Sequence, residues 1–368
     1  MERATHDHIG MPREQLDTPA LLIDLDRLEA NIETMAAHFR AAGKHLRPHV
    51  KSHKTPAIAH LQLNAGAIGI TCAKLGEAEV MAGAGIGDIL VANQVVGSRK
   101  IGRLLALARR CDIMVAVDDP GNLAALDEAG RAAGVAPRVL VEIDIGHGRC
   151  GVRPGPEVVA LARQAAALAG VRYAGIMGYE GHIIDLEDAE ARERGARACL
   201  QRLVDCRADL ERAGLPVPIC SASGTGDYYV ATTFAGITEV QAGSYALMDA
   251  AYGRLGLGFA AALTVLTTVT SRPAPDRVIT DAGLKSVTPE HGLPLVAGRP
   301  ELVCHALSEE HGRLRSTQGP VTDLRPGDLL EFVPGHGCTT MNLYDRVYAM
   351  RQGRVEAIWE IAARGRAQ

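Results

Sequence analysis

Short apolar runs alternate with stretches of helical spacing through the first two thirds of the chain. Between residues 20 and 245 the runs recur roughly every 20 to 30 residues, and most are nearly continuously apolar, as parallel strands covered on both faces are. The intervening stretches, such as residues 24–43, end at Gly. The runs are ALLIDL (20–25), AIGITCA (67–73), DILVAN (88–93), DIMVAVD (112–118), RVLVEIDIG (138–146), YAGIMGYEG (173–181) and PICSASG (218–224).

This succession of βα units predicts an α/β fold with a parallel (β/α)8 barrel of the TIM type, an open doubly wound sheet being the alternative. After about residue 255 the helical spacing nearly disappears, and Val-, Ile- and Thr-rich runs are separated by Gly/Pro turns. We therefore expect an N-terminal segment (1–19), a barrel (20–254) and a C-terminal all-β domain (255–368). The pattern leaves open whether the leading strand at 20–25 joins the β domain.

The composition of the chain argues against some classes of binding partner. The chain has 368 residues, with 39 Lys+Arg against 43 Asp+Glu and a formal net charge of -4, which argues against nucleic acid or an anionic membrane as the main partner. The apolar runs are too short to span a bilayer, and the polar N-terminus favours a cytoplasmic location. The eight cysteines show no CxxC spacing, which indicates reduced thiols rather than disulfides or a structural zinc site.

The densest group of reactive side chains is RPHVKSHK at residues 47–54. If residues 45–51 form the second strand, alternation puts His49, Lys51 and His53 on one face. Arg47 and Lys54 would then disfavour the ammonium form of Lys51 and make it a better amine nucleophile. The alternative is a basic strand end exposed to solvent.

Two small-residue turns follow strand-like runs late in the barrel. Residues 221–226 (SASGTG) offer backbone amides and hydroxyls that suit a phosphate ester, and residues 241–245 (QAGSY) add a second such turn with a phenol. Adjacent loops of this kind match the phosphate corner of (β/α)8 barrels, although each is equally an ordinary strand–helix turn.

Three further groups stand at strand ends. His336 and Cys338 form an HxC pair whose ligand atoms would point to one side of an extended chain and would suit zinc, with chance placement as the alternative. In YEGH, Glu180 or His182 is a candidate acid/base group or a supporting hydrogen bonder. His311 and Asp281 are polar residues with no assigned role.

In their order, these motifs resemble the fold-type III pyridoxal-phosphate enzymes, specifically the D-threonine aldolase / D-serine dehydratase group, which has an alanine racemase-like barrel. The resemblance covers nearly the whole chain. The matching blocks are DTPALLIDLDRLEANI (17–32), RPHVKSHK (47–54), GEAEVMAGAGIGDILVANQVV (76–96), VEIDIGHGRCGV (141–152), SGTG (223–226), QAGSYALMDAAYG (241–253), DAGLKS (281–286), EEHG (309–312) and PGHGCTTMNLYD (334–345).

The resemblance implies roles for individual residues. Lys51 would link covalently to pyridoxal 5'-phosphate, and Arg149 and Tyr179 would line its ring. His182, or a metal-bound water, would be the catalytic base. His336 and Cys338 would bind a divalent metal, Mn2+ or Zn2+. The phosphate would lie among Ser223, Gly224, Thr225, Gly226, Gly243, Ser244 and Tyr245.

The implied reaction is the cleavage of D-β-hydroxy-α-amino acids, D-threonine giving glycine and acetaldehyde, by a homodimer. D-serine dehydration and an aldolase or dehydratase acting on 3-hydroxy-D-aspartate are the alternatives. Cys rather than Asp at position 338 resembles the dehydratases, whereas residues 241–249, 281–286 and 308–312 resemble the aldolases. The sequence YEGH departs from the aldolases' Tyr-His-Gly, which bears on the identity of the base. An amino-acid racemase and a non-catalytic cofactor carrier are further readings, the carrier disfavoured by the C-terminal domain.

Overall fold

The computed structural model describes residues 8–368 and divides the chain into two compact units. The barrel unit comprises residues 35–51, 58–243 and 366–368. The β unit comprises the residues up to 34, residues 52–57 and residues 244–365. Each unit is therefore assembled from segments that are distant in the sequence.

Eight parallel strands form the sheet of the barrel unit in the order β2-β9-β8-β7-β6-β5-β4-β3. A parallel bridge between His49 and Thr71, with the Thr71 amide donating to Pro48 O at 2.8 Å, joins the segment after β2 to β3. The sheet thus closes on itself, and the expected (β/α)8 architecture is confirmed. The strands are β2 (His45–Leu46), β3 (Ile70–Cys72), β4 (Asp88–Gln94), β5 (Asp112–Val117), β6 (Arg138–Ile143), β7 (Arg172–Gly178), β8 (Ile219–Ala222) and β9 (Glu239–Val240).

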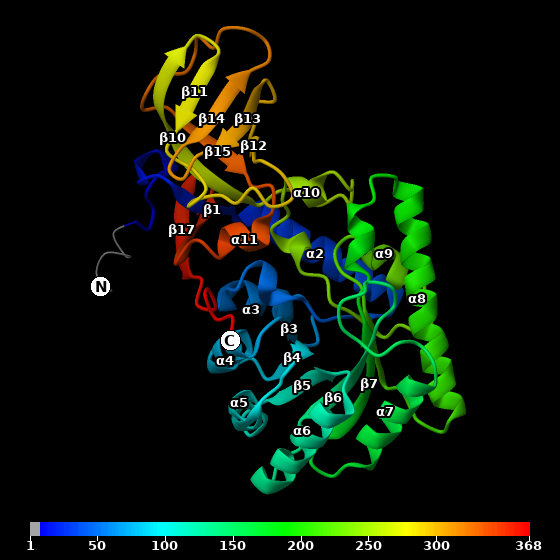
Figure 1. Cartoon of the computed structure of the whole chain (residues 1–368). Helices are drawn as coiled ribbons and strands as arrows, with labels where there is room; N and C mark the ends of the chain where they lie inside the picture. Colours follow the sequence, from blue (N-terminus) through cyan, green and yellow to red (C-terminus); the bar gives the residue numbers. More distant parts are fainter. Residues whose placement is uncertain (1–7) are drawn as a thin grey trace. The chain divides into compact units, whose positions relative to one another are not determined.

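Helices follow the strands in turn, and Figure 1 shows α5, α6 and α7 after β4, β5 and β6. The glycine stops act as expected: Gly43 and Gly134 have φ of 61° and 65°, which favours Gly. The helices are α2 (Leu25–Ala42), α3 (Pro56–Asn64), α4 (Leu75–Gly83), α5 (Ser98–Ala108), α6 (Pro120–Ala133), α7 (Pro156–Ala167), α8 (Ala189–Arg212) and α9 (Tyr228–Ala231), with 3-10 turns η2 (Val50–Ser52) and η3 (Gly181–Asp185). Among residues 8–368, no helix combines the length and the apolar character needed to cross a membrane.

The β unit holds a nine-stranded sheet in the order β11-β14-β13-β12-β15-β10-β1-β16-β17, in which β10 also pairs with β11. Six of these strands therefore form a closed ring. The strands are β1 (Ala20–Asp24), β10 (Leu263–Ala274), β11 (Arg277–Thr280), β12 (Leu295–Val296), β13 (Leu302–Leu307), β14 (Gly312–Ser316), β15 (Leu329–Val333), β16 (Arg346–Arg351) and β17 (Arg354–Glu360). The short helices are α10 (Ala250–Gly253) and α11 (Gly337–Met341), with 3-10 turns η1 (Arg13–Gln15) and η4 (Ser244–Ala246).

The leading strand belongs to this β sheet. β1 pairs antiparallel with β10 and parallel with β16, and Figure 1 shows it in blue among strands from the other end of the sequence. Four of its five residues are buried, which explains an apolar run that looks like a barrel strand. Leu22 packs there in a buried cluster with Leu266 and Tyr348.

The second barrel strand is shorter than the sequence predicts. β2 ends at Leu46, and Val50–Ser52 forms a 3-10 turn, so alternation across residues 45–51 was the wrong basis for placing His49, Lys51 and His53 on one face. Pro48 has no N–H to donate to a strand ladder, which is a local reason for the early end. His53 is fully buried, and its Nδ1 accepts from the Thr55 amide at 3.1 Å.

A buried guanidinium holds the short strand in place. Arg47 donates from Nε to Glu239 Oε1 at 3.0 Å and from Nη1 to Asp88 Oδ1 at 2.7 Å. The side chains of Arg47 and Glu239 are each only 2% exposed, so this is a buried ion pair linking the ends of β2, β4 and β9. Although burial opposes the charge, the two carboxylates raise the pKa of Arg47. The charge of Arg47 is thus balanced by two carboxylates, and the expectation that the ammonium form of Lys51 is disfavoured stays a prediction.

Replacing Glu239 by Ala should destabilise the protein by about 3 to 5 kcal/mol, because it leaves a guanidinium buried with one acceptor fewer. Urea unfolding monitored by circular dichroism measures the change. The control is Glu193→Ala in the pair of Glu193 with Arg197, whose side chains are 42% and 47% exposed. That substitution should cost less than about 1 kcal/mol. Equal unfolding midpoints for the two variants would contradict the assigned role of Glu239.

Candidate active site

The ring of Tyr179 is the meeting point of the site residues in the barrel unit. Tyr179 directly follows β7, and Lys51 Nζ and the Arg149 guanidinium carbon lie 5.6 Å and 5.5 Å from its ring centroid. Lys51 lies in η2 after β2, and Arg149 lies in the loop after β6. The three side chains thus come from the carboxyl ends of three barrel strands, where catalytic groups of such barrels collect. The electron-rich face of the ring favours cationic groups at this distance.

Two glycines leave room for this ring. A Cβ on Gly181 would lie 2.4 Å from Cε1 of Tyr179, and a Cβ on Gly224 would lie 3.4 Å from its Cε2. A side chain at 181 would therefore displace the ring. At 224 the loop passes within van der Waals distance of the ring, so residues 223–226 and Tyr179 form one local site.

The loop of residues 223–226 is buried and held by a side chain that the sequence analysis did not single out. Asp227 Oδ1 accepts from Ser223 Oγ at 2.5 Å and from the Gly224 amide at 3.1 Å. Thr225 is 2% exposed and Gly226 is buried. Ser223 has φ of 65°, a left-handed conformation that the two bonds to Asp227 stabilise. An Asp directly after SGTG, able to bind the loop's own amide, was the available signal.

The second small-residue turn is divided between the units. Gly243 belongs to the barrel unit, and a Cβ there would lie 2.3 Å from His49 O, so only Gly fits. Ser244 and Tyr245 belong to the β unit. Both are buried, and the Tyr245 ring packs 5.8 Å from that of Phe259.

Glu180 and His182 have different surroundings. Glu180 is 1% exposed, and its carboxyl group lies beside that of Asp227, with which it shares a hydrogen bond. Burial first, and then the charge of Asp227, raise the pKa of Glu180 well above its usual range.

His182 stacks on a second imidazole that the sequence analysis missed. The rings of His147 and His182 are 5.6 Å apart and inclined by 23°, and His147 also meets the Tyr179 ring edge-on at 5.7 Å. Burial first, and then Arg149 and His182, lower the pKa of His147, so it is neutral at neutral pH. Its Nδ1 is buried without a partner. His147 stands two residues before Arg149 in the loop that follows β6, and that position was the signal for it.

These residues fit pyridoxal phosphate by their chemistry. The site offers a lysine amine, an aromatic ring and a guanidinium beside a buried Ser/Gly/Thr loop, and the unpartnered Nδ1 of His147 is a polar atom without a protein partner. Lys51, Arg149, Tyr179 and Ser223–Gly226 would hold the cofactor from within the barrel unit.

The HxC pair in the β unit is organised by Asp249. His336 Nδ1 lies 2.9 Å from Asp249 Oδ2, which also accepts from the Gly337 amide at 2.9 Å, and Oδ1 accepts from the Tyr252 amide at 2.8 Å. With Nδ1 engaged, His336 has Nε2 left for a ligand, which is how metal-binding histidines are oriented. Asp249 lies in the matched block 241–253, but the sequence analysis gave it no role.

The local conformation of the pair differs from the expected extended chain. His336 has extended dihedral angles, but it caps α11, and Cys338 lies in the first turn of that helix. Burial lowers the pKa of His336, but hydrogen bonds with Asp249 and Cys338 outweigh it and raise the pKa to about 10. The argument from strand alternation was therefore wrong, although the side chains of His336 and Cys338 are still in contact. The negative charge of Asp249 and Cys338 beside the His336 ring favours a cation there.

The donor set fits a metal held by two protein ligands. Imidazole nitrogen and cysteine sulfur suit zinc and similar divalent ions. Within residues 8–368, no group of three or more His, Cys, Asp or Glu side chains is arranged to hold an ion. His336 and Cys338 would therefore leave the other coordination positions open to water or substrate.

The two polar residues without an assigned role lie elsewhere in the β unit. Asp281 accepts from Thr267 Oγ1 at 2.7 Å and from the Thr268 amide at 2.9 Å, and His311 is exposed.

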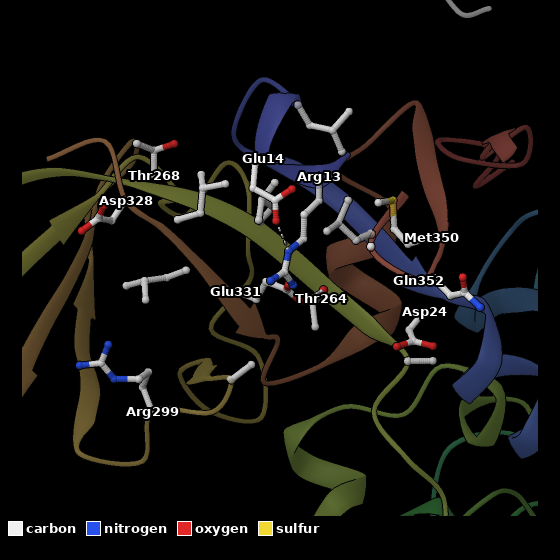
Figure 2. Close-up of a pocket in the computed structure, with 18 of the residues that line it drawn as sticks. Arg13, Glu14, Asp24, Thr264, Thr268, Arg299, Asp328, Glu331, Met350 and Gln352 are labelled. Atoms are coloured by element: carbon white, nitrogen blue, oxygen red, sulfur yellow. Dashed lines mark hydrogen bonds and ion pairs between the residues drawn. The ribbon is translucent and has the colours of Figure 1, made fainter. Parts of the chain in front are cut away.

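A cavity of about 840 Å³ in the β unit contains none of the predicted site residues. Figure 2 shows Arg13, Glu331 and Arg299 on its wall, with Arg13 paired to Glu14. Arg13 also pairs with Glu331 at 2.6 Å, and Arg299 pairs with Glu301 and Asp323. Since these cations are already paired, the cavity has no evident preference for an anionic ligand.

Comparisons with known proteins agree with the resemblance inferred from the motifs. Residues 23–251 match the family described as "Alanine racemase, N-terminal domain", and residues 262–350 match the "Putative serine dehydratase domain". The D-threonine aldolase of Arthrobacter sp. is 44% identical over 97% of this chain and 95% of its own length. The 3-hydroxy-D-aspartate aldolase of Paracoccus denitrificans (strain Pd 1222) is 38% identical over 97% and 94%.

A solved structure shows the same fold over nearly the whole chain. The crystal structure of D-threonine aldolase from Filomicrobium marinum superimposes with a TM-score of 0.94 at 38% identity, covering 97% of this chain and 98% of that one. The alanine racemase-like barrel followed by a C-terminal β domain is therefore confirmed. The chain belongs to the fold-type III pyridoxal-phosphate enzymes, in the family that joins an alanine racemase N-terminal domain to a serine dehydratase-like domain.

Proposed function

We propose that this protein is a pyridoxal-phosphate- and divalent-metal-dependent lyase that cleaves D-β-hydroxy-α-amino acids, with D-threonine giving glycine and acetaldehyde. The observation that carries the proposal is the His336–Cys338 pair organised by Asp249, in a chain that also has the Lys51–Tyr179–Arg149 cluster. A racemase needs two bases and no metal on a hydroxyl. The 44% identity to a D-threonine aldolase supports the same choice.

Pyridoxal phosphate, when bound, supplies an electron sink for negative charge developing at the substrate Cα. Lys51 is the residue that would hold it covalently, and residues 223–226 would bind its phosphate. Tyr179 fixes the separation of Lys51 and Arg149 because both cationic groups lie near its ring. Asp227 orients the loop through Ser223 and Gly224.

His182 is the proposed base that removes the proton of the substrate β-hydroxyl, which breaks Cα–Cβ. The neutral ring of His147 stacks on it and fixes the plane of its imidazole. Cys199 Sγ lies 4.0 Å from His182 Nε2, and burial raises the pKa of that thiol, so no thiolate competes for the proton.

His336 and Cys338 would bind a divalent ion, Mn2+ or Zn2+, whose charge makes a coordinated hydroxyl more acidic. Asp249 holds the His336 ring so that Nε2 is the ligand atom. These two proposed ligands, His336 and Cys338, form the metal half-site, which lies within the β unit. The proposed cofactor residues other than Ser244 and Tyr245 lie within the barrel unit.

A dehydratase is the second candidate, and Cys338 favours it. Cysteine rather than aspartate at the second ligand position is the pattern that resembles the D-serine dehydratases, and residues 262–350 match a putative serine dehydratase domain. In that reaction Lys51 would remove the Cα proton and the metal would assist the departure of hydroxide. A 3-hydroxy-D-aspartate substrate is a further alternative. The homodimer and the cytoplasmic location stay predictions.

Product analysis tests the proposed reaction. The enzyme loaded with pyridoxal phosphate and Mn2+ or Zn2+ should convert D-threonine to glycine and acetaldehyde, and removal of the ion with EDTA should abolish turnover without loss of the cofactor's absorbance. Pyruvate and ammonia from D-serine, with no glycine from D-threonine, would establish the dehydratase instead. Metal-independent racemisation of alanine would exclude both lyases.

Lys51→Ala should abolish the yellow absorbance of the bound cofactor, because no other amine is proposed to link to it. Absorbance spectroscopy after gel filtration with excess pyridoxal phosphate measures this. Lys54→Asn is the matched control, since Lys54 lies in the same segment at φ of 54° and Asn tolerates that conformation. A yellow Lys51→Ala protein would show that the linking residue is misassigned.

Glu180→Gln should become more stable relative to the wild type as the pH rises from about 5 to 8. The raised pKa means that folded Glu180 keeps its proton where the unfolded chain loses it, so wild-type stability falls with pH in this window by up to about 1.4 kcal/mol per pH unit. Gln is neutral in both states. Thermal unfolding at several pH values measures the difference.

The exposed Glu128 provides the control for that series, because Glu128→Gln should show a nearly constant difference from the wild type. A pH-independent difference for Glu180→Gln would mean that Glu180 is ionised in the folded protein.

A further inference from the structure

The imidazole of His291 lies beside the metal half-site, and neither the sequence analysis nor the family resemblance gave it a role. Its ring centroid is 5.0 Å from that of His336, with the planes inclined by 74°. The Tyr252 ring also stacks on the His336 ring, with the centroids 6.4 Å apart and the planes inclined by 27°. All three rings belong to the β unit.

Specific contacts hold the segment that carries His291 against α11. Thr288 Oγ1 and Thr339 Oγ1 are 2.7 Å apart, and the Thr288 amide lies 3.4 Å from Thr340 Oγ1. A Cβ on Gly335 would lie 1.9 Å from Gly292 O, so the turn after His291 packs directly on the backbone before His336. The segment is thus fixed from both sides of His291.

The backbone of His291 is strained for a residue with a side chain. Its φ is 58°, in the left-handed region, which a non-glycine residue adopts only at a cost in free energy. The residue is exposed, so packing in a core does not offset this cost. A strained, exposed imidazole beside a candidate ligand points to a functional role.

The two rings lie within reach of one oxygen ligand. An ion on Nε2 of His336 would lie about 2.1 Å from that nitrogen, and an oxygen bound to the ion would extend the reach by a further bond of about 2 Å and a hydrogen bond of about 2.8 Å. At 5.0 Å, His291 is close enough to touch the coordination shell of an ion on His336. Since the described chain presents no three-ligand cluster, an oxygen ligand of the ion is the partner that fits.

We propose that His291 hydrogen-bonds an oxygen, of water or of the substrate hydroxyl, bound to the metal ion held by His336 and Cys338. It is a positioning residue, and the inference rests on the proposed function. His291 would orient the oxygen ligand and strengthen metal binding from outside the direct ligand set, an effect typically worth 10- to 100-fold in affinity.

Metal affinity, rather than turnover, tests this role. The enzyme loaded with pyridoxal phosphate is stripped of metal with EDTA, transferred to buffer without chelator and titrated with MnCl2, and the free ion is measured from its electron paramagnetic resonance signal. His291→Gly removes the ring and relieves the left-handed backbone, and it should weaken Mn2+ binding by about 10-fold or more. His291→Asn tolerates the same backbone and keeps a hydrogen-bonding group, so it should stay within about 3-fold of the wild type.

The chain offers a matched control. His311 is the central residue of a second Glu-His-Gly tripeptide, identical in sequence to the one around His291, and it is also exposed in the β unit. The His311→Gly variant should therefore bind Mn2+ with wild-type affinity. Wild-type affinity in His291→Gly would overturn the proposal, as would equal weakening in His291→Asn and His291→Gly, or in His311→Gly. Electron spin echo spectroscopy that found two directly bound imidazoles would also overturn it.

His336→Ala separates this inference from the proposed function. Loss of Mn2+ binding in that variant with wild-type binding in His291→Gly would refute the role of His291 alone. Wild-type binding in His336→Ala would refute the metal half-site itself, and the role of His291 with it.

Discussion

The barrel unit depends on one buried ion pair. β2 spans only two residues and cannot be held by a long ladder of strand hydrogen bonds, and Pro48 shortens that ladder further. The Arg47 guanidinium makes the connection instead, through Glu239 of β9 and Asp88 of β4. Lys51 follows four residues later, so the position of its amine is set by a charge interaction at the base of the strand. Structure and proposed chemistry are thereby divided within RPHVK: the arginine anchors the segment, and the lysine is the residue proposed to react.

Carboxyl groups organise important segments of both units in three comparable ways. Asp88 accepts from Arg47 and Arg138, Asp227 binds a hydroxyl and an amide of the glycine loop, and Asp249 binds an imidazole and two amides. Each places a functional segment that would otherwise be an irregular loop. A loop held by a carboxylate has a defined conformation at low cost in strain, which a site for a cofactor or a metal requires.

The sequence predicted what local patterns determine. Continuous apolar runs identified the parallel strands, and glycine stops identified the helix ends, because these signals depend on neighbouring residues. Ordered motifs brought out Lys51, Tyr179 and His336. The sequence did not assign β1 to a sheet, since a strand buried between β10 and β16 has the same apolar pattern as a barrel strand. Nor did it find His147, Asp227 or Asp249, whose roles are defined by partners from other segments, and it misjudged two conformations where a helical turn replaces extended chain.

Each end of the described chain belongs to a unit that is formed mainly by residues distant from it in the sequence. β1 lies between β10 and β16, whereas residues 366–368 belong to the barrel unit, where the Gly76 amide donates to Gln368 O at 2.8 Å and Arg103 reaches the same carbonyl. During synthesis on the ribosome, β1 must wait for strands made much later, and the barrel unit lacks the contacts of residues 366–368 until these residues emerge. Neither unit corresponds to a continuous gene fragment, so shuffling or truncation at the boundary near residue 255 would separate each unit from part of itself. Because each unit needs segments from both parts of the sequence, we expect the proposed cofactor residues and the proposed metal ligands to be kept together when the gene is duplicated or recombined.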